Sequence, residues 1–180
     1  MDYDSSSIIL TSERLIFRQH IMADMDDYCI MDMDPEVRRY VGGQPRTRED
    51  AERRFMGAVK PATDRLGMWA TILKETGKYI GRCGVYPHFK PNGGTYDGEG
   101  SLAFYIAREY WRQGFATEAG EAFIKFGFGQ LGLNRILTAV EAGNDASVHV
   151  LEKLQFELVS TEVVHRTYYH FALQNPVSHK

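Results

Sequence analysis

The stretch "EYWRQGFATEA", from Glu109 to Ala119, directly follows the apolar run "SLAFYIA", from Ser101 to Ala107. This order predicts a strand, a tight turn at Gly114 and the start of a helix. The first N–H groups of a helix have no partner within the helix and carry a partial positive charge, so they attract anions. Arg108 and Arg112 add positive charge beside the turn. Two interpretations remain open at this point: an ordinary helix start, or a loop whose backbone amides hold a phosphate.

Strands are indicated on both sides of this stretch. Apolar residues alternate within 10–20, and two apolar runs flank the turn sequence "ETG" at 75–77, which is typical of a hairpin. The segment 87–100 is so rich in proline and glycine that we expect no regular structure in it. Further strands are expected at 101–107 and 134–140, with a closing hairpin at 156–173.

Helices are expected between these strands. Asp34 precedes a proline at the first helical position, and Thr47 stands three residues before Asp50, and both patterns are typical of helix N-termini. We expect the helix after Asp34 to end near Gly42 and Gly43. The remaining expected helices cover 22–33, 51–60, 117–130 and 144–156. The sequence therefore predicts one mixed α/β domain over residues 8–176.

The composition is that of an ordinary globular protein. Cys29 and Cys83 stand far apart without a C-x-x-C pair, so we expect buried thiols in a reducing compartment and neither a disulfide framework nor a zinc site. The six histidines show no ligand spacing, and we assign no metal. No run of 18 apolar residues and no signal sequence is present, so we expect a cytoplasmic protein with no membrane partner. The formal charge of −3 argues against general affinity for nucleic acid.

The loop at Trp111 to Ala116 resembles the pyrophosphate loop of the GNAT acetyltransferase superfamily, whose pattern is Gln or Arg, two residues, Gly, one residue, then Gly or Ala. Trp111 departs from the pattern at its first position. However, "YWRQGFATEA" is similar to the "YWGKGYATEA" form of the branch that acetylates ribosomal-protein N-termini. The segments "TSERLIFRQ", "DPEVRRYVGG", "GKYIGRCGVY" and "NDASVHVLEKLQF" resemble that branch in the same order, with Gln155 where glycine is usual.

The resemblance implies the GNAT fold, an α/β domain with a mixed central sheet of about six to seven strands and about four helices. It implies a splay between strands four and five, here the strands at 101–107 and from Arg135 to Val140. The pantetheine arm of coenzyme A would lie in that gap, and acetyl-CoA would be the cofactor. The implied cofactor-binding residues are Phe104, Tyr105, Ile106, Ala107, Arg112, Gln113, Gly114, Phe115, Ala116, Thr117, Asn144, Ser147 and Lys153.

Acetyl transfer needs a neutral amine, a donor for the thioester oxygen and a proton for the leaving thiolate. A lysine amine costs roughly 4.6 kcal/mol to deprotonate at pH 7, whereas a protein α-amine costs about 1.1 kcal/mol. In many members, a tyrosine on the helix that corresponds to 144–156 supplies the proton. This chain has no tyrosine there, and Ser147 is the matching candidate. Asn144 and Ser147 also suit an ordinary helix cap. Glu99 and Glu141 are candidate bases, although a solvated surface carboxylate is the favoured interpretation of each.

In the resembled family, the first two helices help to wall the acceptor site. The segment 22–34 carries several aspartates, which predict a solvated acidic face or, in a sharper hypothesis, a surface that steers a cationic acceptor. These residues are Asp24, Asp26, Asp27, Asp32 and Asp34. The connection at His165 and Arg166 is shorter than is usual in the resembled branch, which would either leave the acceptor cleft open or leave room for a second subunit in a homodimer.

The leading interpretation is an acetyl-CoA-dependent N-acetyltransferase that acts on a primary amine by direct transfer in a ternary complex. The favoured acceptor is a protein N-terminal α-amine. The alternatives are a small-molecule amine, such as an amino acid, a polyamine or an antibiotic, and a non-catalytic sensor of acyl-CoA.

Overall fold

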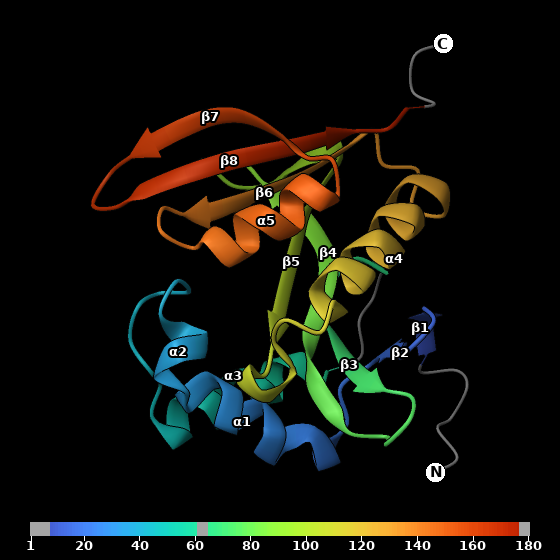
Figure 1. The fold of residues 1–180 in the computed structure, drawn as a ribbon, viewed down its shortest axis with the longest axis vertical. Coiled ribbons are helices and arrows are strands. Elements are labelled where there is room, and N and C mark those ends of the chain that lie inside the picture. The colour runs from blue at the N-terminus through green and yellow to red at the C-terminus, as the bar shows by residue number, and fades with distance from the viewer. Residues whose placement is uncertain (1–7, 61–64, 177–180) are drawn as a thin grey trace.

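The computed structural model describes residues 8–60 and 65–176, which contain one eight-stranded sheet (Figure 1). The strand order is β1-β2-β3-β4-β5-β6-β8-β7, and every neighbouring pair is antiparallel except β5 and β6, which are parallel. The strands are β1 (Ile8–Thr11), β2 (Leu15–Arg18), β3 (Trp69–Leu73), β4 (Tyr79–Phe89), β5 (Thr95–Ile106), β6 (Arg135–Glu141), β7 (Glu157–Val163) and β8 (Thr167–Gln174). The predicted mixed α/β sheet is confirmed.

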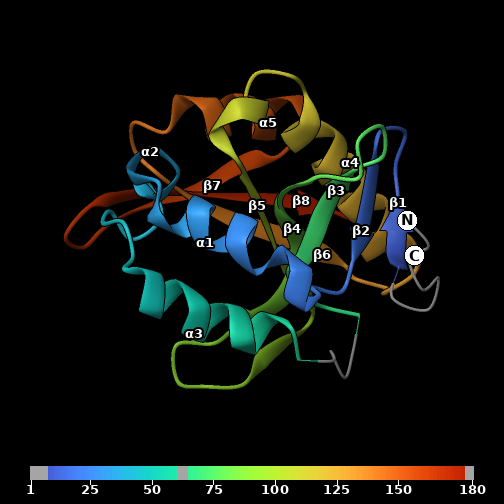
Figure 2. The ribbon, with the colours of Figure 1, turned by 90° about the horizontal axis from the view of Figure 1, so that it is seen from below.

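Helices cover both faces of this sheet (Figure 2). They are α1 (Met25–Met33), α2 (Pro35–Arg38), α3 (Arg48–Ala58), α4 (Phe115–Gly129) and α5 (Asp145–Lys153), with short 3₁₀ helices at Met22–Asp24 and Arg108–Tyr110. The larger core lies between the sheet and α4 and α5, where the rings of Phe17 and Phe123 meet edge to face at 4.8 Å. A second core lies between the sheet and α1 and α3, around Tyr28 and Phe55.

The helix starts are formed by the residues that the sequence indicated. Asp34 accepts a hydrogen bond from the backbone N–H of Glu36 at 2.8 Å, and Thr47 accepts one from Asp50 at 3.2 Å. However, α2 ends at Arg38, before the predicted end at 42–43. The carbonyl of Arg38 accepts turn bonds from residues 41 and 43, and both glycines there have a positive φ, so the chain leaves the helix early.

The expectation of no regular structure in 87–100 is wrong. β4 extends to Phe89, β5 begins at Thr95, and these two residues pair with each other. Between them, Lys90 and Gly94 close a turn in which Gly93 and Gly94 have φ near +90° and +77°. The glycines therefore specify one tight turn inside a long hairpin, and the residues around it continue the two strands (Figure 2).

The predicted splay is present between β5 and β6. The two strands pair from Glu99 opposite Arg135 to Ser101 opposite Leu137. Beyond this point β5 continues to Ile106 along β4, whereas β6 continues to Glu141 along β8. The sheet therefore opens after Ser101, and Figure 1 shows β5 running away from β6.

Candidate active site

A loop with free backbone amides lies beside the open end of β5. Arg112 and Gly114 both have a left-handed backbone, with φ of 60° and 84°, and Gly114 is the N-cap of α4. In the described part of the chain, no backbone N–H from Arg112 to Thr117 donates a hydrogen bond, and the first bond of the helix runs from Glu118 to the Gly114 carbonyl at 3.0 Å. We call residues 112–117 the amide loop. Six unbonded N–H groups at a helix start fit the diphosphate of coenzyme A.

Residues of the β1–β2 connection hold the amide loop in place. Arg14 donates to the Gln113 carbonyl at 3.0 Å and to the Glu118 carboxylate at 2.7 Å. Glu118 also accepts from the Ser12 hydroxyl at 2.6 Å. Burial acts in the opposite direction, but the hydrogen bonds from Ser12 and Arg14 lower the pKa of Glu118. The first turn of α4 is therefore tied to the β1–β2 connection.

Trp111, which departs from the family pattern, links the loop to β5. Its indole N–H donates to the Ile106 carbonyl at 2.7 Å. The Ala107 N–H donates to the Ile80 carbonyl at 2.9 Å, so two of the implied pantetheine-binding backbone groups already have partners. Phe104 packs on the larger core, whereas Tyr105 lines a cavity on the opposite face of the sheet.

The length of α5 separates Lys153 from the other two implied residues, Asn144 and Ser147. Asn144 is its N-cap, and the Asn144 side-chain oxygen accepts from the Ser147 backbone N–H at 3.3 Å. The structure thus brings these two half-buried residues together in the geometry of an ordinary cap. Lys153 is exposed in the last turn of α5, about 12 Å along the helix axis from Asp145, the first residue of α5.

Both candidate carboxylate bases are paired with arginine. β5 does extend to Glu99, whose carboxylate lies 3.5 Å from Arg135. Glu141 accepts from a single Arg166 nitrogen with both of its oxygens, at 2.7 and 2.9 Å, and its side chain is 13% exposed. Neither carboxylate therefore faces the splay as an unpaired group.

A histidine that the sequence analysis did not single out lies at the apex of the splay. His88 Nδ1 is 2.9 Å from the Ser101 hydroxyl, and the ring of His88 stacks on Tyr96. Ser101 is buried and is the last residue of β5 that pairs with β6. His88 belongs to the 87–100 segment, so only the strand pairing of that segment could have indicated its position.

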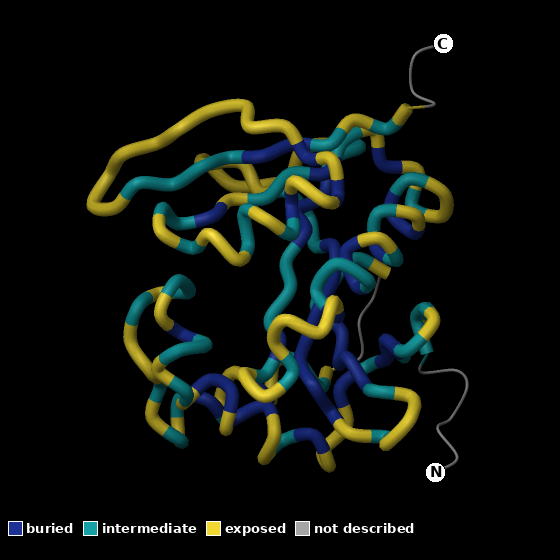
Figure 3. The backbone as a smooth tube through the Cα atoms, viewed as in Figure 1, coloured by how far each residue is buried: buried dark blue, intermediate teal, exposed yellow. Residues whose placement is uncertain are grey.

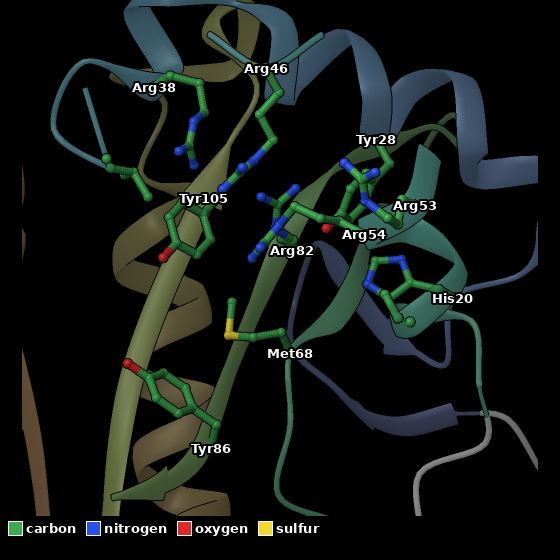
Figure 4. A pocket seen from close by; sticks show the side chains of 14 residues that line it. His20, Tyr28, Arg38, Arg46, Arg53, Arg54, Met68, Arg82, Tyr86 and Tyr105 are labelled. Atoms are coloured by element: carbon green, nitrogen blue, oxygen red, sulfur yellow. The ribbon is translucent and has the colours of Figure 1, made fainter. Parts of the chain in front are cut away.

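A cavity of about 630 Å³ lies on the face of the sheet that α1 and α3 cover (Figure 4). Within residues 8–60 and 65–176, 14 residues line it, of which five are arginine and none is acidic. We call it the arginine cavity. The arginines are Arg38, Arg46, Arg53, Arg54 and Arg82, and the other labelled residues are His20, Tyr28, Met68, Tyr86 and Tyr105.

The predicted solvated acidic face is wrong for two of its aspartates. Asp32 is fully buried beneath the cavity, where it pairs with Arg82 at 2.5 Å and Arg46 at 3.2 Å. Asp24 is also buried and forms a two-pronged pair with Arg18, with both distances at 2.7 Å. Arginines of β2, β4 and the 39–47 connection therefore neutralise two aspartates that the sequence alone predicts on the surface.

His20 and the two cysteines are buried. Burial lowers the pKa of His20 from 6.5 to about 4, opposed by Asp24 and reinforced by Arg82 and Arg18, so His20 is neutral at pH 7. The cysteines are free and buried as expected, and burial raises the pKa of Cys83 to about 12. Within residues 8–60 and 65–176, no cluster of three or more His, Cys, Asp or Glu could hold a metal, and no helix is long and apolar enough to cross a membrane.

Comparison with known proteins gives one family. Residues 14–157 match the family model described as "Acetyltransferase (GNAT) domain". The uncharacterized N-acetyltransferase p20 of Bacillus licheniformis is 32% identical over 150 residues, or 82% of each protein. A GNAT-family acetyltransferase structure from Bacillus anthracis has a TM-score of 0.81 at 20% identity and covers 92% of this chain and 98% of its own. Spermidine N-acetyltransferase from Vibrio cholerae, solved with CoA and spermine, has a TM-score of 0.72 at 15% identity, covering 90% and 96%.

Proposed function

This chain belongs to the GNAT acetyltransferase family and is an acetyl-CoA-dependent N-acetyltransferase, and on that premise we propose that it transfers the acetyl group directly to a primary amine that enters through the arginine cavity. The observation that carries the proposal is the run of unbonded amides from Arg112 to Thr117 beside the open end of β5. The arginine cavity lies on the opposite face, and Tyr105 of the open stretch of β5 forms part of its wall.

Acetyl-CoA supplies an activated acetyl thioester when it is bound. The amide loop would hold its diphosphate, with Arg112 adding charge. Backbone groups of β5 beyond Ser101 would hold the pantetheine arm, together with the Asn144 side-chain amide. Ser147, in the first turn of α5, is the proposed proton donor to the leaving thiolate, and Lys153 is the proposed contact for an outer phosphate.

Direct transfer is supported by the state of the cysteines. An acyl-enzyme route through sulfur requires an accessible thiolate. Cys29 and Cys83 are both fully buried, and the raised pKa of Cys83 keeps it protonated at neutral pH. The amine and the thioester would therefore have to be bound at the same time.

For proton removal, we propose His88 acting with Ser101. An α-amine needs only about 1.1 kcal/mol to lose its proton at pH 7, so a histidine is a sufficient base. His88 and Ser101 lie 2.9 Å apart at the apex of the splay, where no ion pair occupies His88 in the described residues. Glu99 and Glu141 are weaker candidates because arginines already hold their carboxylates.

Two acceptor classes are supported by different observations. A protein N-terminal α-amine, of the ribosomal-protein type, is supported by the similarity of the amide loop to that branch. A small-molecule amine is supported by the arginine cavity, because a volume of about 630 Å³ falls within the usual range for small-ligand sites.

The test is thiol release from acetyl-CoA across a panel of small amines and peptides with basic and acidic N-termini. We expect turnover on at least one primary amine, with one acetylated product per thiol released. Thermal stabilisation by acetyl-CoA without turnover on any member would support the sensor and contradict the proposed transfer. Turnover that continues without an acceptor amine would contradict it as well.

A further inference from the structure

We propose that the arginine cavity binds an oxyanion of the acceptor, so the substrate is an amine that also carries a carboxylate or phosphate group. This inference rests on the proposed function, because it gives the chemical class of the acceptor in the same site. The binding groups are Arg38, Arg46 and Arg82, whose guanidinium groups converge beside Tyr105 in Figure 4.

Arg38 has no acidic partner in the described part of the chain. It is only 6% exposed. The one hydrogen bond that its side chain makes to the described residues is long, from Nε to the Gln44 carbonyl at 3.4 Å. Burial, followed by the charges of Arg46 and Arg82, lowers the pKa of Arg38, and Asp32 opposes that effect. The Arg38 guanidinium points into the cavity, so a bound oxyanion could supply the acidic partner that Arg38 lacks among the described residues.

Arg82 is fixed in orientation on the wall of the arginine cavity. It is 8% exposed, and its guanidinium lies over the rings of Tyr28 and Tyr105 at 4.3 and 4.9 Å. Nη2 donates to Asp32 at 2.5 Å, whereas Nη1 is buried without a hydrogen-bond partner. A rigid guanidinium on the cavity wall, beside a second guanidinium, suits a two-oxygen anion.

The local charge balance points the same way. The three converging arginines share one carboxylate, that of Asp32, so two positive charges remain uncompensated. Among the described residues, the only other arginine of the lining with an ion pair is Arg53, which contacts Asp50 outside the cavity. A monoanionic carboxylate or a dianionic phosphate lowers this repulsion, whereas a polyamine raises it.

Tyr105 connects this anion site to the proposed transfer. It lies on β5 beyond Ser101, where the strand no longer pairs with β6, and its ring also contacts Arg82. An acceptor whose anionic group binds Arg38 and Arg82 would therefore place its amine toward the open stretch of β5. The anion site would orient the acceptor, and the chemistry would occur at the splay.

The first experiment compares matched acceptors. Each amino acid is tested against its own carboxamide, with O-phosphoethanolamine as the phosphate arm and spermidine as the cationic arm. We expect a carboxylate or a phosphate member to have a kcat/KM at least tenfold above its neutral or cationic counterpart, and the better arm identifies the anion. Equal rates for acid and amide, or spermidine as the best acceptor, would overturn the inference.

The second experiment uses Arg38→Met, which keeps the buried stem, with Arg39→Met as the matched control, since Arg39 is exposed and pairs with Glu36. We expect Arg38→Met to raise the KM of the anionic acceptor at least tenfold and to leave the KM of its amide unchanged. Arg39→Met should change neither. An equal rise for acid and amide would mean that Arg38 acts on the fold and would contradict the anion site.

Thermal unfolding separates the anion site from catalysis. With saturating CoA to occupy the amide loop, inorganic phosphate at constant ionic strength should stabilise the wild type and Arg39→Met, and not Arg38→Met. If phosphate does so while no amine is turned over, the proposed function fails and the anion site stands. If amines are turned over and phosphate stabilises all three proteins equally or not at all, the anion site fails and the transferase stands.

Discussion

His20 makes folding sensitive to acid. It is 2% exposed and packs within about 6 Å of the rings of Tyr28, Phe55 and Tyr79. Its pKa is about 4 in the folded state and 6.5 in the unfolded state, so the unfolded chain binds more protons between these values. The contribution is fully present above pH 6.5 and is lost as the pH falls toward 4, by about 3 kcal/mol in total.

We therefore expect His20→Phe to lose less stability than the wild type between pH 7 and pH 4.5. Urea unfolding at the two pH values measures this difference, and the titration of the carboxylates cancels in the comparison. Parallel losses in the two proteins would mean that His20 is not responsible for the acid sensitivity.

His88→Gln tests the proposed base. We expect kcat/KM to fall about tenfold at pH 7, because the variant must wait for the acceptor amine to lose its proton to water. The loss should shrink as the pH rises past the pKa of the amine, since the amine is then already neutral. His149→Gln is the control, because His149 is exposed on α5. A loss of the same size at every pH would indicate a structural role for His88.

At the scale of elements, the start of α4 depends on Gly114. Its φ of 84° is a left-handed conformation that an alanine adopts only with strain. We expect Gly114→Ala to lower stability by about 1 kcal/mol and to raise the Kd for CoA about tenfold, measured by calorimetry. The matched control is Gly129→Ala at the other end of α4, where an added Cβ meets nothing within 4 Å. An unchanged Kd in Gly114→Ala would remove the amide loop from the diphosphate site.

Local signals made most elements predictable. Asp34 and Thr47 cap their helices through residues two or three positions away, so the sequence alone contains both partners. Local sequence does not predict the strands within 87–100, because these strands depend on the pairing of Phe89 with Thr95 and on the continuation of β5 to Ser101. A proline and glycine count measures local preference and carries no information on that pairing.

At the scale of the whole molecule, charge is distributed unevenly. The chain has a formal net charge of −3, yet no described residue that lines the arginine cavity is acidic. Its arginines come from α2, the following connection, α3 and β4, so no spacing in the sequence brings them together. The aspartates of the 22–34 segment are close together in sequence, so the sequence alone reveals their cluster. The arginines that neutralise two of them come from separate elements, so the sequence does not reveal these ion pairs. The sequence alone therefore suggests a cationic acceptor, whereas the arginine cavity supports the anionic acceptor that we propose.

Salt gives opposite results for the two kinds of acceptor. The Debye length falls from about 20 Å to about 7 Å between 20 and 200 mM salt, so attraction and repulsion at the cavity are both weakened. We expect the KM of an anionic acceptor to rise about threefold over this range, and that of any cationic acceptor to fall. Steady-state kinetics at fixed, saturating acetyl-CoA measures both, with the neutral amide as the control. If the KM of a cationic acceptor rises with salt, the result would support the hypothesis that the aspartates of the 22–34 segment steer a cationic acceptor.

The placement of the amide loop and the arginine cavity on opposite faces of one sheet has a consequence for inhibition (Figure 2). Under the proposed function, the sheet divides two entrances that meet only where β5 leaves β6. A compound that fills one entrance leaves the other open, so it competes with one substrate and not with the second. Fragments found separately for the two entrances could then be joined through the opening, and the linked molecule would need only the short span that the acetyl group itself crosses.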